Sequence, residues 1–180
     1  MIKLLLPLLI MQSLDFENLI GKDVSIVHAI LLDKGFENDN IFPNIKSYAL
    51  DEETYDSFYG LAFNIITIGI NENNYVSDIT IHFNQVIDSS FYYKFIIDYD
   101  KPDIIQVVDG VKFISDWKEN KTENGIEQKV RKVTLNTREG SFEENPFFMI
   151  WNKEGYQIKA LLRHKQNTSE ITFRLPSKNF

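Results

Sequence analysis

The side chains best suited to acid–base or metal chemistry in this chain are its three histidines, His28, His82 and His164. A zinc site on a helix needs two histidines about four residues apart, and no two of these histidines are so placed. His82 lies where polar and apolar residues alternate, so we expect it on the polar side of a strand, where only a longer diagonal leads to Asp78. We therefore expect no metal, no cofactor and no catalytic histidine.

Other common catalytic patterns are also missing from the sequence. It contains no cysteine, which removes thiolate nucleophiles, cysteine-ligated zinc and disulfides. It has neither a Gly-x-Ser-x-Gly turn nor a glycine-rich phosphate loop. Asp98, Asp100 and Asp103 resemble part of a calcium loop, but the central glycine and distal glutamate are absent. We therefore predict that the protein is not an enzyme. A hydrolase whose paired carboxylates are distant in sequence stays open as an alternative.

One stretch of the chain, between positions 48 and 59, interleaves acidic and aromatic side chains. Tyrosines offer large contact area at little entropic cost, and carboxylates attract a cationic partner. The predicted contact residues are Tyr48, Asp51, Glu52, Glu53, Tyr55, Asp56, Phe58 and Tyr59. The alternative is a solvated loop whose aromatic side chains anchor it to the core. A second acidic loop, over 139–145, has the same character in weaker form.

The charge balance points to the same kind of partner. The chain carries 26 acidic and 19 basic residues, a net charge of −7. Carboxylates repel phosphates, so nucleic acid is not expected as a ligand. A basic protein partner fits this charge, and solubility alone is the simpler explanation.

Two capped helices must frame any such surface. Asp23 is the predicted cap of the first helix, whose apolar residues follow at helical spacing until Gly35 ends it. Asp88 is the predicted cap of the second helix, which Pro102 stops because the residue before a proline resists helical geometry. Both helices should present one apolar stripe to a sheet.

Strand patterns occupy most of the remaining chain. A polar loop is expected over 37–40, and the Asp109-Gly110 pair predicts a tight hairpin turn within 104–117. The other predicted strands cover 58–70, 75–83, 128–137, 147–151, 156–164 and 170–175. The sequence thus predicts an α+β protein: an antiparallel sheet meander with two helices packed on one face. The order helix-then-strands occurs twice, which is also the pattern of two diverged halves. No Gly-, Pro- or Ser-rich linker divides residues 14–180, so we expect a single domain.

Residues 1–13 have the layout of a secretory leader, because Lys3 precedes an apolar run that ends at Gln12-Ser13. The run is too short to span a bilayer, so no stable membrane insertion is expected. Met11 is large for a cleavage site, and a buried first element is the alternative. We expect a signal peptide over 1–13 and a periplasmic or secreted protein, with a cytoplasmic one as the alternative.

Two segments carry a resemblance to known families. Leu19-Ile20-Gly21-Lys22-Asp23, leading into Val27 and Leu31-Leu32, and later Tyr99-Asp100-Lys101-Pro102-Asp103, resemble the helix–turn patterns of small exported bacterial α+β proteins. These include outer-membrane assembly lipoproteins of the SmpA type, whose cysteine this chain lacks, and the β-lactamase-inhibitor-like fold. In size, acidity and lack of catalytic motifs the chain is also similar to bacterial toxin-immunity proteins. The resemblance implies an exported α+β protein and assigns no site residue.

Together these features predict a non-enzymatic binding protein. The favoured hypothesis is an immunity or inhibitor protein whose acidic, aromatic loop covers the cleft of a basic partner protein. A periplasmic carrier of an apolar ligand, held in a cavity under a curved sheet, is one alternative. A component of an envelope assembly is another. The sequence does not determine the oligomeric state.

Overall fold

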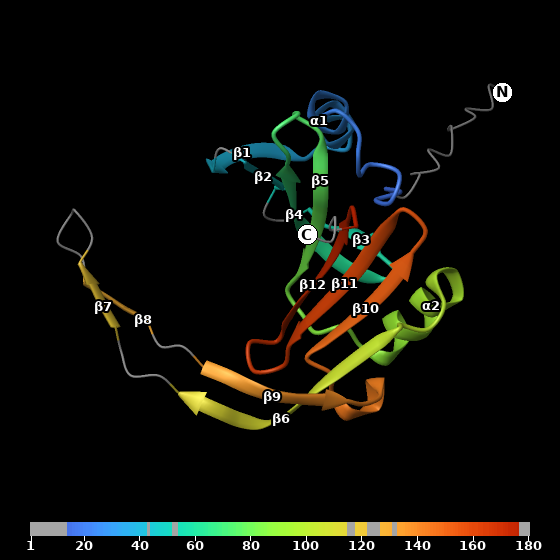
Figure 1. Cartoon of the computed structure of the whole chain (residues 1–180). Coiled ribbons are helices and arrows are strands. Elements are labelled where there is room, and N and C mark those ends of the chain that lie inside the picture. Colours follow the sequence, from blue (N-terminus) through green and yellow to red (C-terminus); the bar gives the residue numbers. More distant parts are fainter. Residues whose placement is uncertain are drawn as a thin grey trace.

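The computed structural model describes residues 14–42, 44–51, 54–114, 118–121, 127–130 and 133–176 (Figure 1). The predicted leader, residues 1–13, lies outside this part of the chain. The fold class is confirmed, because two helices accompany a ten-stranded antiparallel sheet.

The helices are α1 (Val24–Asp33) and α2 (Ser89–Tyr99), with a short 3-10 turn η1 (Phe142–Glu144). The strands are β1 (Glu37–Phe42), β2 (Ile45–Ala49), β3 (Asp56–Phe58), β4 (Leu61–Ile70), β5 (Val76–Phe83), β6 (Ile104–Ile114), β7 (Lys118–Lys121), β8 (Glu127–Val130), β9 (Val133–Glu139), β10 (Phe148–Lys153), β11 (Tyr156–Arg163) and β12 (Thr168–Arg174).

The large sheet has the order β1-β2-β4-β5-β12-β11-β10-β6-β9, and β3 pairs with β4 in line with β2. Strands β7 and β8 form a separate two-stranded sheet. Apart from β3 and the β7–β9 segment, each half is one helix followed by four strands. The last strands of the two halves, β5 and β12, pair antiparallel at the centre of the sheet. This topology matches two diverged halves.

Local capping explains both helices. The Asp23 carboxylate accepts the Ser25 backbone N–H at 2.8 Å, and the Asp88 carboxylate accepts that of Phe91 at the same distance. Helix α1 ends as predicted: Gly35 has φ +86°, and the Phe36 N–H reaches the Leu31 carbonyl at 3.1 Å.

The core lies between the helices and the inner face of the sheet, and aromatic rings fill it. Phe95 of α2 packs on Tyr99 and Trp151, with ring centroids 4.4 and 5.1 Å apart. Phe58 of β3 packs on Phe173 of β12 at 6.1 Å. Rings from both halves therefore belong to a single cluster.

Two predicted connections are wrong. Asp109-Gly110 is not a hairpin turn, because β6 runs through it as one strand. These two residues face the single residue between Leu135 and Thr137 of β9, so they form a β-bulge. Gly110, at φ +102°, supplies the positive φ there. The polar segment 37–40 is not a loop, since it belongs to the edge strand β1 and pairs with β2.

The predicted strand over 58–70 is interrupted. Tyr59 and Gly60 both have positive φ and turn the chain between β3 and β4. The sequence pattern missed this turn because the residues on both sides of it are apolar.

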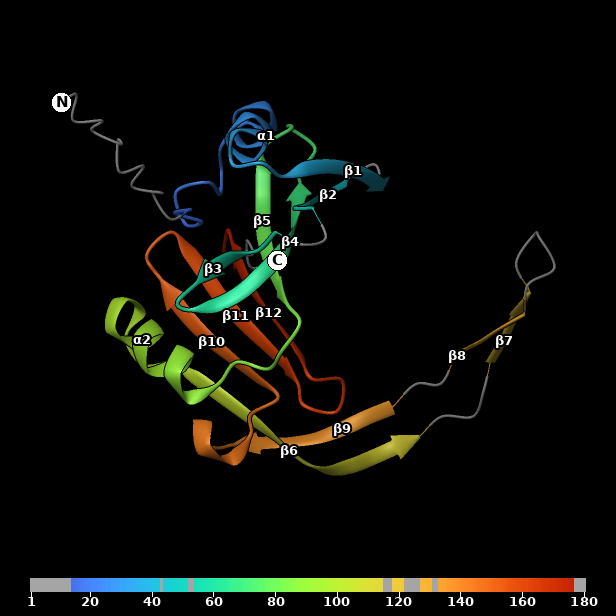
Figure 2. The same cartoon turned by 180° about the vertical axis from the view of Figure 1, so that it is seen from behind.

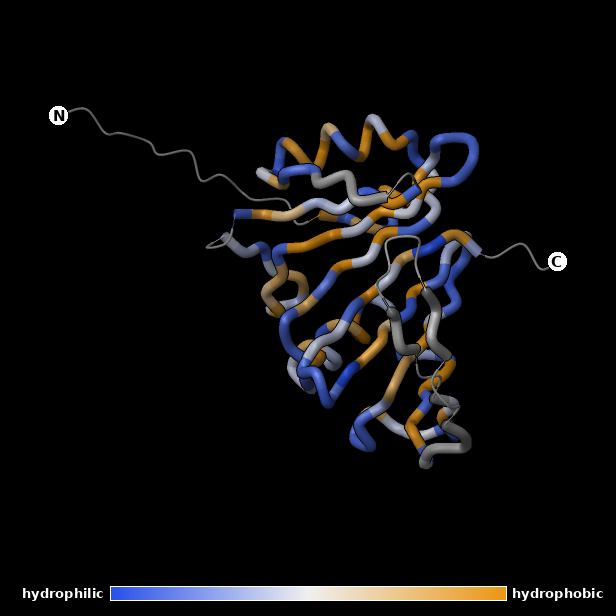
Figure 3. Tube along the Cα trace, turned by 90° about the vertical axis from the view of Figure 1, so that its left-hand side faces the viewer, coloured by the Kyte–Doolittle hydropathy of each residue, from blue (hydrophilic) through white to orange (hydrophobic). Residues whose placement is uncertain are grey.

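Both helices cover the same face of the sheet and leave the other face, here called the open face, uncovered by them (Figures 1 and 2). The β1–β2 and β6–β9 ends of the sheet extend to the side away from α2, and so frame the open face. Seen from that side, hydrophobic and hydrophilic residues alternate along the strands (Figure 3).

Candidate functional site

The open face of the central strands carries ordered rows of polar side chains. In one row Thr67, Thr80, Thr172 and Lys159 are partners across β4, β5, β12 and β11. In the next row the partners are Gly69, Asp78, Arg174 and Gln157 on the same strands. Alternation within each strand sends these side chains outward, since their neighbours Ile79, Ile81, Ile171 and Phe173 are buried in the core.

A polar cluster of two hydrogen-bonded pairs spans four of these strands. Thr67 Oγ1 and His82 Nε2 are 3.0 Å apart, and His82 Nδ1 lies 3.7 Å from a Glu170 carboxylate oxygen. The Arg163 guanidinium donates to the same oxygen of Glu170 at 3.0 Å. Each side chain is thereby held in a fixed position on the sheet.

The surroundings of His82 favour the neutral imidazole. Burial lowers its pKa below the ordinary value of 6.5, the Glu170 carboxylate opposes this effect, and the nearby Arg163 charge adds to it. A neutral imidazole suits the hydrogen bond with Thr67.

Thr67, His82 and Glu170 have the order of a nucleophile, a base and an orienting acid, but not the required geometry. The 3.7 Å gap between His82 and Glu170 is too long for a hydrogen bond, and Arg163 already occupies that carboxylate. Thr67 also sits in a strand paired on both sides, with β2 and β5, so its neighbouring N–H groups are committed to the sheet. The cluster is better suited to contact than to acyl transfer.

Two open hollows lie next to each other on this face. One, of about 360 Å³, is lined by Asp78, Thr80, Lys159, Leu161, Glu170, Thr172 and Arg174. The other, of about 330 Å³, is lined by Ile65, Thr67, His82, Phe83, Asn84, Arg163, Thr168 and Ser169. Both run along β5, β11 and β12, where these strands meet.

Exposed apolar side chains surround the polar rows. Ile45, Ile65 and Val108 are 45%, 37% and 46% exposed. The strand register places each of them on the open face. Ile45 is opposite Gly69, and Ile65 is opposite His82. Val108 is two residues along β6 from Gln106, which is opposite Phe148. These exposed apolar side chains lie on the same face as the polar groups.

The structure places three of the four aromatic members of the predicted contact loop apart from its acidic ones. Tyr48 is a fully buried residue of β2, and its hydroxyl lies 3.0 Å from His28 Nδ1. Phe58 is buried in the aromatic core, and the half-buried Tyr59 donates its hydroxyl to Asp98. Tyr48, Phe58 and Tyr59 therefore anchor the chain, as the alternative interpretation expected.

The remaining described members of that loop are accessible. Asp51 is exposed, Tyr55 is 54% exposed, and Asp56 is partly exposed, whereas Glu52 and Glu53 lie outside the described residues. The loop leaves the sheet between the Ala49–Ile65 and Asp56–Phe63 pairs. It therefore borders the open face beside Ile65.

The acids at the end of α2 each have a separate partner. Asp98 accepts from Tyr59, Asp100 pairs with Lys153 Nζ at 3.2 Å, and Asp103 accepts the Asn152 N–H at 2.6 Å. Within the described ranges, no group of three His, Asp or Glu side chains is placed to hold a metal ion.

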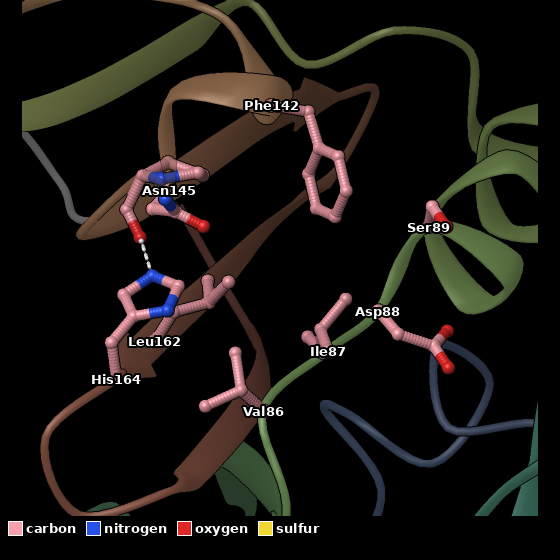
Figure 4. A pocket seen from close by; sticks show the side chains of 9 residues that line it. Val86, Ile87, Asp88, Ser89, Phe142, Asn145, Leu162 and His164 are labelled. Carbon is pink, nitrogen blue, oxygen red and sulfur yellow. Dashed lines mark hydrogen bonds between the residues drawn. The ribbon is translucent and has the colours of Figure 1, made fainter.

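A third hollow, of about 270 Å³, lies near the start of α2 (Figure 4). His164 Nε2 donates there to the Pro146 carbonyl at 2.9 Å, and the Asp88 carboxylate points away from His164 and caps the helix. These polar groups already have structural roles.

Comparisons with family models, with curated proteins and with solved structures found no match. Neither α1 nor α2, the helices of the described part, is long and apolar enough to cross a membrane.

Proposed function

We propose that this chain is a non-enzymatic binding protein that covers a partner protein with the open face of its sheet, as an inhibitor or immunity protein would. The observation that carries the proposal is the open face, where a fixed polar network lies among exposed Ile45, Ile65 and Val108. Side chains that are already immobile lose little entropy on binding, so the contact area yields more affinity.

A basic partner protein is favoured by the net charge of −7. Such a charge raises the association rate with a cationic protein over distances of about a Debye length. Asp51 and Asp56, at the border of the open face, add carboxylates where the partner would arrive. Export to the periplasm or outside the cell, through the leader, belongs to the same proposal.

The aromatic core supports a binding protein over a carrier of an apolar ligand. A carrier needs an apolar cavity of several hundred Å³ between sheet and helices. Rings packed 4.4–6.1 Å apart occupy that space here. An envelope assembly component remains the alternative, and it would associate stably with a membrane complex.

Co-purification with the product of the neighbouring gene, followed by titration, tests the proposal. Ile65→Glu places a charge on the open face, and Ile97→Glu makes the same change on α2, where Ile97 is 78% exposed. We expect Ile65→Glu to weaken binding about tenfold or more, as at a well-packed contact, and Ile97→Glu to leave it unchanged. Equal affinities of the two variants would contradict the proposal.

Charge reversal at Asp51 and Asp56 tests the role of the acidic border separately. We expect the double variant Asp51→Lys/Asp56→Lys to slow association at low salt, because the lost attraction acts mainly on the association rate. An unchanged rate would remove these residues from the mechanism.

A further inference from the structure

We infer that the hollow between Lys159 and Arg174 receives a carboxylate side chain of the partner protein. This inference rests on the proposed function and specifies the chemistry of the same open face. Under this inference the partner is basic overall and places one acidic residue at the centre of the contact.

Within the described part of the chain, the two cations of this hollow form no ion pair. Among the described residues, no carboxylate lies within 4.0 Å of the charged groups of Lys159 or Arg174. Arg174 Nε donates instead to the neutral Gln157 amide oxygen at 2.9 Å, and Lys159 Nζ lies 5.6 Å from the centroid of the Phe148 ring. Both side chains are thus held in place while their charge stays available.

Hydroxyl groups complete the hollow as a site for an anion. Thr80 and Thr172 lie on its floor with their oxygens 2.8 Å apart. One hydroxyl donates to the other, so the accepting hydroxyl retains its own proton for a third group. Lys159 and Thr172 are direct cross-strand partners, and Arg174 is two residues further along β12. An ammonium, a guanidinium and a hydroxyl therefore line the same hollow, where each can donate to an anion.

The acids in the same hollow select a single carboxylate over a chain of phosphates. Glu170 is neutralised by Arg163, but among the described residues Asp78 accepts a hydrogen bond only from the Ser77 hydroxyl, at 2.8 Å. The Asp78 carboxylate also packs directly over Gly69, because a Cβ added at Gly69 would come within 2.2 Å of Asp78 Oδ2. This fixed negative charge repels a polyanion, whereas a protein segment can meet it with a cation beside its carboxylate.

The test uses the full chain with acetyl-Gly-Glu-Gly-amide, which carries a single carboxylate, as the probe, followed by NMR of the backbone amides of Thr80, Lys159 and Thr172. We expect saturable shifts at these amides. The double variant Lys159→Gln/Arg174→Gln should weaken probe binding at least tenfold. The control Lys22→Gln/Lys101→Gln removes the same charge from two exposed lysines at the helical side and should bind as the parent does.

Absence of shifts in the parent, or equal binding by both double variants, would overturn the inference. Tighter binding of a short oligonucleotide at the same amides would also overturn it, in favour of a phosphate site. The probe needs no partner protein, so its outcome is independent of the Ile65 and Ile97 titration. Probe binding together with equal partner affinity of those two variants would reject only the proposed function.

Discussion

At the scale of single residues, the open face is defined by side chains that long-range pairing brings together. Thr67, His82 and Glu170 come from three strands and meet only because β5 pairs with both β4 and β12. From the sequence, alternation predicted that His82 faces the polar side of a strand, which the structure confirms. It suggested Asp78 as a neighbour, whereas the observed partners are Thr67 and Glu170.

His82 should make stability depend on pH. Its pKa is lowered in the folded state, mainly by burial, so the folded protein binds fewer protons than the unfolded chain, whose histidine titrates near the ordinary value of 6.5. The stability due to neutral His82 is thus present above pH 6.5 and is lost as the pH falls through the lower, folded pKa. We expect His82→Gln, which retains an amide for Thr67, to lose less stability than the parent between pH 7.5 and 5.0.

Denaturant unfolding of both proteins at the two pH values measures this difference. Equal losses of unfolding free energy would show that His82 does not titrate in the folded protein as its surroundings indicate.

At the scale of elements, the features predicted best from the sequence are the helix ends, which depend on residues close by in the chain. Asp23 and Asp88 cap the helices, and Gly35 ends the first one, because each acts on a backbone group only a few residues away. Asp109-Gly110 was misassigned because the same positive φ serves a tight turn or a bulge. Whether a turn or a bulge forms depends on the pairing of β6 with β9, and the residues next to Asp109-Gly110 do not determine that pairing.

The contact loop was only partly predictable for a similar reason. Tyr48 and Phe58 belong to strands β2 and β3, which flank a short loop along one edge of β4. Strand alternation over so few residues gives a weak signal, so their burial could not be separated from the exposure of Tyr55.

Across the β4–β5 pair, Gly69 makes room for Asp78. We expect Gly69→Ala to destabilise the protein by about 1–3 kcal/mol, because the new methyl group forces the Asp78 carboxylate from its place. Asp78→Ala alone should cost less, and the double variant Gly69→Ala/Asp78→Ala should recover most of the loss. A double-mutant cycle of unfolding free energies measures the coupling, and additive costs would show that the two positions do not interact.

At the scale of the whole molecule, we expect the two halves to unfold as one unit because they share a core. Phe173 of β12 packs against rings from three other places: Phe16 before α1, Phe58 of β3 and Tyr99 of α2. Phe16 and Phe58 belong to the first half and Tyr99 and Phe173 to the second, so this cluster is shared by both halves.

Phe173→Ala should therefore destabilise the entire protein. A fully buried phenylalanine replaced by alanine costs about 3–5 kcal/mol. Far-UV circular dichroism and tryptophan fluorescence should report a single, coincident unfolding transition at lower denaturant concentration. Ile97→Ala, at an exposed site, should change stability by less than about 0.5 kcal/mol. Separate transitions by the two probes would mean that the halves unfold independently.

The central place of β12 also determines when the protein can fold during its synthesis. Strand β12 lies between β5 and β11 in the sheet. Until residues 168–174 have left the ribosome, β5 and β11 therefore each have one edge whose backbone groups are unpaired. Strand edges with unpaired backbone N–H and C=O groups can pair with strands of other chains. The sheet therefore cannot be completed before β12 has been synthesised, and we expect chaperones that shield β5 and β11 until then to raise the yield of folded protein.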